Sequence, residues 1–98
     1  MPTPNTLFAL FHVANVSGVE ERLKSLSPAL SLKVGDNSWF IITPSTTTTK
    51  ELSDKIGITG GEVSTGIIVR VENYWGNTSK ATWEWITAKM GAPFDAAI

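Results

Sequence analysis

Two strand-length runs in this chain are apolar on both of their faces, and this feature limits the folds that the chain can adopt. Residues 6–13 (TLFALFHV) and 38–43 (SWFIIT) carry apolar side chains at odd and even positions alike. A strand with one solvent-exposed face alternates apolar and polar residues, whereas a strand that is covered on both faces can be apolar throughout. Both runs therefore indicate central strands of a sheet.

The segments that flank these runs have the periods of helices and of half-exposed strands. Apolar residues recur at spacings of three and four over residues 16–26, and a shorter stripe of this kind covers residues 48–56. Residues 29–34 and 66–72 alternate, and their second faces carry Lys33, Arg70 and Glu72. These patterns predict two helices and two edge strands.

Capping signals place the starts of the two helices. Ser17 with Glu20, and Thr48 with Glu51, have the spacing of a capping box, in which each side chain satisfies the other residue's backbone N–H. Asn15 belongs to an N-x-[ST] sequence, which we interpret as accidental or as a helix cap. Gly57 is a suitable C-terminal cap for the second helix.

The order of these elements is strand, helix, strand, strand, helix, strand, followed by a further helix. This order predicts an α+β fold of the ferredoxin-like split β-α-β type, with a four-stranded antiparallel sheet and two helices on one face. The first and third strands are central in that topology, which agrees with their apolar character. With 98 residues we expect one domain, with a core over about 6–72 and a Trp-rich turn and helix over 73–90.

The stretch ENYWGNTSKATWEWI (72–86) holds three of the four tryptophans. The two-helix layer covers one face of the sheet, so Phe8 and Leu10 are predicted to need cover on the other face. The helix that carries Trp83 and Trp85 can supply this cover from its own chain or from a second copy. We favour such a lid over a binding platform, because aromatic rings are more often buried. The candidate interface residues are Phe8, Leu10, Trp39, Trp75, Trp83 and Trp85.

Composition excludes some classes of function. The net charge is −1 and the pI is near 5.7, which argues against a dedicated nucleic-acid binder. The chain has no cysteine, so neither a disulfide framework nor thiolate chemistry is available. The apolar run Leu7 to Val13 is too short to span a membrane and lacks the layout of a signal peptide. We expect a cytoplasmic protein.

Several of these segments together resemble a known family. They are the strand at 6–13, the Ser-Trp strand at 38–42, the helix with ELSDKI and the strand GIIVRVE that enters a Tyr-Trp-Gly turn. In this order, over about residues 6–86, they resemble small Cas2-like, or SinR-like, ferredoxin-fold proteins of bacteria and phages. The resemblance implies a homodimer and association with nucleic acid. Nuclease members of the family hold a metal with an Asp at the end of the first strand, whereas residues 11–15 (FHVAN) contain no carboxylate.

No constellation of residues indicates an enzyme. His12, the single histidine, has two interpretations: a general base or metal ligand, or an ordinary polar residue at a strand end. We favour the second interpretation, because no second His and no acidic run accompanies it. Asp36 and Asp54 do not pair with another carboxylate at a catalytic spacing. Phosphate-binding glycine motifs and nucleophile elbows are absent from the sequence. We expect no catalytic residue, metal or cofactor.

These observations lead to two hypotheses. The first is a small non-enzymatic protein-interaction module that self-associates as a homodimer, through its sheet or its C-terminal aromatic segment, and that can also bind another protein. The alternative is a Cas2-like nucleic-acid-binding protein without nuclease activity. Its weak candidate contacts are Lys33, Arg70, Tyr74, Trp75 and Lys80, with Glu72 and Glu84 opposing them.

Overall fold

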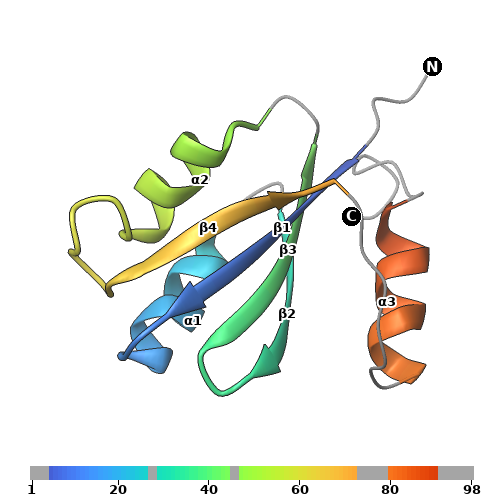
Figure 1. The fold of residues 1–98 in the computed structure, drawn as a ribbon, viewed down its shortest axis with the longest axis horizontal. Coiled ribbons are helices and arrows are strands. Elements are labelled where there is room, and N and C mark those ends of the chain that lie inside the picture. The colour runs from blue at the N-terminus through green and yellow to red at the C-terminus, as the bar shows by residue number, and fades with distance from the viewer. Residues whose placement is uncertain (1–4, 27–28, 45–46, 73–79, 91–98) are drawn as a thin grey trace.

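The computed structural model describes residues 5–26, 29–44, 47–72 and 80–90 (Figure 1). Seven elements follow one another in the described residues: β1 (Asn5–His12), α1 (Val16–Ser25), β2 (Leu30–Gly35), β3 (Ser38–Pro44), α2 (Thr49–Ile56), β4 (Gly66–Val71) and α3 (Lys80–Met90).

The four strands form a single sheet in the order β2-β3-β1-β4, and every neighbouring pair is antiparallel. The predicted α+β class and four-stranded antiparallel sheet are therefore confirmed. The two runs that are apolar on both faces are the central strands β1 and β3, as predicted. Each central strand is paired on both sides, so its backbone groups are hydrogen-bonded within the sheet.

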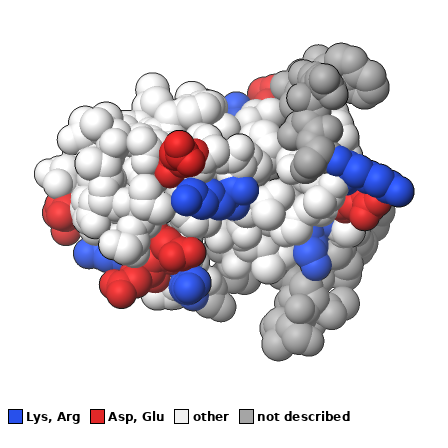
Figure 2. All heavy atoms as spheres, turned by 90° about the horizontal axis from the view of Figure 1, so that it is seen from below, with Lys and Arg blue, Asp and Glu red and all other residues white. Residues whose placement is uncertain are grey.

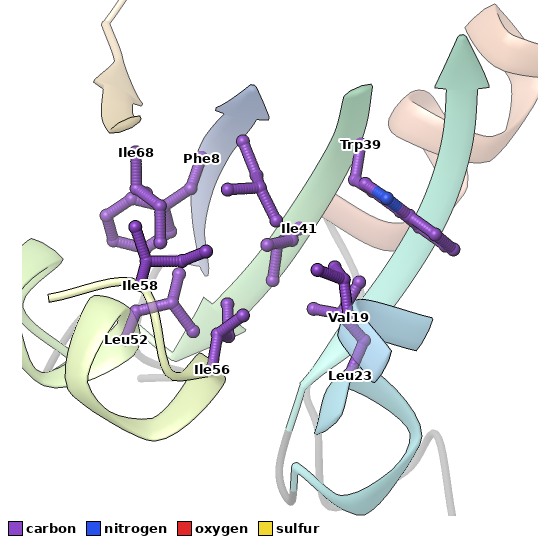
Figure 3. Close-up of a cluster of buried hydrophobic side chains, with 10 residues drawn as sticks. Phe8, Val19, Leu23, Trp39, Ile41, Leu52, Ile56, Ile58 and Ile68 are labelled. Atoms are coloured by element: carbon purple, nitrogen blue, oxygen red, sulfur yellow. The ribbon is translucent and has the colours of Figure 1, made fainter. Parts of the chain in front are cut away.

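The main core lies between the sheet and the helices α1 and α2. Val19 and Leu23 of α1 and Leu52 and Ile56 of α2 belong to one cluster of buried side chains (Figure 3). The sheet contributes side chains from alternate positions of its strands: Phe8, Leu10, Trp39, Ile41 and Ile68. Ile58, in the loop after α2, completes the cluster. The two helices therefore share one face of the sheet.

The prediction that Phe8 and Leu10 lie on the face away from these helices is wrong. Both side chains are fully buried among the residues of α1, α2 and the sheet. The physical reason is the symmetry of the pattern in β1. Because both sets of alternating residues are apolar, periodicity does not show which set meets the helices.

The other face of the sheet is formed by the opposite set of alternating residues. Leu7 pairs with Ile42 in β3 and Ala9 pairs with Phe40, and Leu7, Ala9 and Ile42 are buried. The helix α3 lies on this side, away from α1 and α2 (Figure 1), and it contacts β1 and β2. The Asn5 side chain donates a hydrogen bond to the Lys89 carbonyl oxygen at 2.8 Å. The C-terminal helix thus packs on its own chain.

The apolar residues of α3 recur at two overlapping spacings, Trp83–Ile86–Met90 and Ala81–Trp85–Ala88, which predict a wide apolar face, and the structure buries only part of it. Thr82 and Ile86 are the buried residues of the helix, while Trp83 and Trp85 are half-buried. Ala81 and Ala88, which the apolar spacing placed in this face, are exposed. A helix with bulky residues around much of its circumference can meet the sheet in several rotations, so its pattern does not determine the rotation.

The second helix begins as predicted. Thr48 and Glu51 form the predicted capping box, with the Glu51 N–H donating to Thr48 Oγ1 at 3.1 Å and the Thr48 N–H donating to Glu51 Oε1 at 3.1 Å. Hydrogen bonds from Thr48 to the Glu51 carboxylate, first from the backbone N–H and then from the side chain, hold the pKa of Glu51 below its ordinary value. The second helix also ends as predicted, with Gly57 in the left-handed region at φ 88°.

The first helix is capped by Asn15 and not by the predicted Ser17–Glu20 box. Asn15 adopts φ 62°, which asparagine tolerates, and its Oδ1 accepts a hydrogen bond from the Gly18 N–H at 3.3 Å. The interpretation of Asn15 as a helix cap is therefore confirmed. A Cβ at residue 18 would collide with the Asn15 side chain, so Gly18 makes this cap possible.

The capping box of α2 provides a first prediction. Replacing Thr48 by Ala removes the side-chain acceptor, and we expect the unfolding free energy to fall by about 1 kcal/mol. Urea unfolding followed by circular dichroism measures this change. The control is Thr87→Ala on the exposed side of α3, which should change stability by less than about 0.5 kcal/mol. Equal losses in both variants would show that Thr48 does not cap the helix.

Candidate interaction surface

The end of β1 carries a buried histidine, His12. The His12 side chain contacts the Trp39 side chain and the backbone of Ala14, two residues further along the chain. Trp39 Nε1 donates to His12 Nε2 at 3.2 Å, and His12 Nδ1 lies 3.0 Å from the Ala14 carbonyl oxygen. An indole N–H can only donate, so Nε2 accepts and we assign the proton to Nδ1, which donates to Ala14. Both ring nitrogens are thus engaged within the protein, as befits a structural residue.

Three further polar side chains tie this strand end to neighbouring segments. Ser64 Oγ donates to the Ala14 carbonyl oxygen at 2.6 Å, and the Asn15 side chain donates to the Val63 carbonyl oxygen at 2.8 Å. The Asn37 side chain donates to the Val13 carbonyl oxygen at 3.2 Å. These bonds hold the segment after β1 against the loop before β4 and against the β2–β3 turn. The sequence offered no signal for Ser64 or Asn37 in this role, because their partners are backbone carbonyls far away along the chain.

The His12–Trp39 bond provides a second prediction. In His12→Leu the buried Trp39 indole N–H loses its acceptor, and we expect the unfolding free energy to fall by about 1–3 kcal/mol. Trp39→Phe should then cost less in the His12→Leu background than in the wild type, because the two residues are coupled. Chemical denaturation of the four proteins in this cycle measures both effects.

The control for the cycle is Val13→Ala, a change at the next residue, whose side chain is exposed. It should alter stability by less than about 0.5 kcal/mol. The structural account of His12 would be contradicted by strictly additive effects of the His12 and Trp39 substitutions.

The candidate acidic residues do not assemble into a catalytic or metal site. Asp36 is exposed in the turn between β2 and β3. Asp54 lies on the exposed side of α2, where Lys50 Nζ is 3.0 Å from Asp54 Oδ2. A hydrogen bond from the Thr59 hydroxyl, followed by the one from Lys50, lowers the pKa of Asp54. Within the described residues, no group of three His, Asp or Glu side chains is placed to hold a metal ion.

The candidate nucleic-acid contacts are not brought together. Lys33 lies on β2 and Arg70 on β4, which are the two opposite edges of the sheet. Arg70 forms an ion pair with Glu72 at 3.2 Å, and Lys80 on α3 lies 3.7 Å from Glu84. Figure 2 shows basic and acidic side chains interspersed on the face that it presents. Tyr74 and Trp75 lie outside the described residues. The described cations therefore do not form the continuous basic surface that phosphate binding requires.

The candidate interface residues divide into three groups. Phe8, Leu10 and Trp39 are buried in the core under α1 and α2, so they leave almost no side-chain area for a partner. Trp83 and Trp85 are half-buried on α3. Trp75 lies outside the described residues.

A different set of apolar side chains is exposed on the sheet. Phe11 is 51% exposed, Ile67 60% and Val69 40%. Phe11 pairs with Ile67, and Ala9 pairs with Val69, so the three side chains lie together on the face away from α1 and α2. We call these three residues the β1–β4 strip. The α3 helix lies against β1 and β2, and the strip holds the most exposed large apolar side chains that the structure describes on this face.

Sequence reasoning missed this strip, although its signal was present. Residues 67, 69 and 71 form an apolar face of their strand, and Phe11 belongs to the odd-numbered set of β1. Only the β1–β4 register shows that these side chains are neighbours, and only the position of α3 shows that they are left uncovered.

Comparisons of the chain with protein-family models, with curated proteins and with solved structures found no match. Among the described residues, none of the helices combines the length and apolar character that crossing a lipid bilayer requires.

Proposed function

We propose that this protein is a small non-enzymatic interaction module that self-associates as a homodimer through the β1–β4 strip. The observation that carries this proposal is the exposure of three adjacent large apolar side chains, Phe11, Ile67 and Val69, on the sheet face away from α1 and α2. Contiguous exposed apolar side chains on a sheet face can form part of a protein–protein contact. Burial of apolar side chains of the strip against a second copy contributes to the driving force.

We also propose that the fold is ferredoxin-like and related to the Cas2-like proteins. The strand order β2-β3-β1-β4, with the two connecting helices on one face, supports this assignment. The nuclease activity of that family is not part of the proposal, because His12, with both ring nitrogens engaged, stands where the nuclease members hold their metal.

The charge distribution favours a protein partner over a nucleic acid. The net charge is −1, and Arg70 and Lys80 each have an acidic neighbour. An interface driven by apolar burial is insensitive to salt or is strengthened by it, whereas a complex with nucleic acid weakens steeply as salt rises. Salt dependence therefore separates the two hypotheses.

The test is the mass of the protein by sedimentation velocity, from sub-micromolar to several hundred micromolar protein and at low and high salt. We expect a dimer that persists at high salt. Ile67→Lys places a charge in the strip, and its burial cost should weaken the dimer by about 100-fold or more. Circular dichroism shows whether the variant keeps its fold.

The matched control is Val34→Lys, which changes an exposed apolar residue on the opposite edge strand, β2. It should leave the dimer intact. A wild-type monomer over the whole concentration range would overturn the proposal, as would equal weakening by both substitutions. A mass increase with mixed DNA or RNA at low salt only would favour the nucleic-acid alternative.

A further inference from the structure

The outer edge of β4 carries backbone groups that point away from the sheet. The Val13 N–H donates to the Thr65 carbonyl oxygen at 2.9 Å, just beyond the paired strands. Hydrogen-bonded pairs alternate along an antiparallel ladder, so Ile67, Val69 and Val71 are the β4 residues that bond to β1. The N–H and C=O groups of Gly66, Ile68 and Arg70 consequently point to the outer side. Among the described residues, no strand pairs with this side.

The two edges of the sheet differ in their protection. The β2–β3 pairing has a register shift between Lys33 and Gly35, and Lys33 is exposed on that edge. Bulges and lysines of this kind discourage a further strand from pairing. The β1–β4 register runs without interruption from Leu7↔Val71 to His12↔Gly66, and β4 contains no proline. Although β4 carries Arg70, which is paired with Glu72, it is the more regular of the two edges, and we expect another strand to pair there.

We propose that β4 of one copy pairs in antiparallel fashion with β4 of a second copy, about a two-fold axis at Val69, to give a continuous eight-stranded sheet. This inference rests on the proposed function and specifies the geometry of its dimer. In this register Val69 lies opposite Val69 of the second copy, and Ile67 lies opposite its Val71. Every pair on the strip side is apolar, so Ile67 and Val69 are partly covered by their counterparts across the interface, whereas Phe11, on β1, keeps its exposure. Ile68 and Arg70 lie opposite each other and exchange backbone hydrogen bonds.

The area of the strip explains why a second copy needs the edge as well. With side chains of roughly 150–200 Å² each, exposures of 51%, 60% and 40% amount to about 250–300 Å². A stable interface buries about 800 Å² on each partner. Strand pairing adds the flank of β4 and a ladder of hydrogen bonds, and a two-fold arrangement closes without open ends. The strand's own apolar pattern supplies the matching surface, which is why we assign a second copy as the occupant.

Cysteine cross-linking tests this geometry, since the natural chain contains no cysteine. At the two-fold axis, residue 69 and its copy form a non-hydrogen-bonded pair with Cα atoms about 4.5 Å apart, within disulfide range. Residue 67 and its copy are offset by four positions, about 13 Å along the strand, which exceeds that range. In a glutathione redox buffer we expect Val69→Cys to form a covalent dimer at least about tenfold faster than Ile67→Cys. Val34→Cys, on the other edge, gives the background rate.

Sedimentation of the reduced variants and of the wild type separates the possible failures. A non-covalent dimer in which Val69→Cys cross-links no faster than Val34→Cys overturns the edge pairing and leaves the proposed function standing. Faster cross-linking of Ile67→Cys than of Val69→Cys also overturns it, because the two sheets then pack face to face or pair in another register. A wild-type monomer overturns both proposals.

Discussion

The structure depends on a mismatch between the sheet and the helices that cover it. The central strand β1 presents apolar side chains on both faces, and α1 and α2 cover only one of them. On the second face α3 contacts β1 and β2, and Leu7 and Ile42 are buried there. The side chains at the β4 side of this face, Phe11 and Ile67 among them, remain exposed. A monomer therefore leaves apolar area in water, and a second copy paired along β4 covers part of it in the proposed dimer.

The polar residues at the end of β1 hold the neighbouring segments of the sheet in place. His12 accepts from Trp39 under α1 and α2, while Asn15 and Ser64 fasten the loop before β4 to the segment after β1. A Cβ at Gly66 would collide with the Phe11 carbonyl oxygen and the His12 backbone, so glycine allows β4 to begin this close to β1. Together these contacts fix the register that puts Phe11 beside Ile67.

Much of the fold could be predicted from local pattern, and the failures share one cause. Apolar periodicity, the Thr48–Glu51 box and Gly57 were sufficient for the elements, the central position of β1 and β3 and the limits of α2. The face on which Phe8 lies was predicted wrongly because a doubly apolar strand has no preferred side. The rotation of α3 could be predicted only in part, because its bulky residues surround much of the helix. Predicting the β1–β4 strip requires knowing which residues of the two strands pair, and the local sequence pattern does not contain that information.

The most direct measurement of the central claim is amide hydrogen exchange along β4, resolved by residue with NMR, at increasing protein concentration. Ile67 and Val69 bond to β1 in every state, so their amides should be protected throughout. The amides of Ile68 and Arg70 point outward. We predict that they exchange fast in dilute protein and slowly at concentrations where the dimer is populated. Exchange at Ile68 and Arg70 that stays fast while the mass doubles would contradict the paired-edge dimer. Protection of these amides at every concentration, in a protein that remains monomeric, would show that its own chain covers the edge.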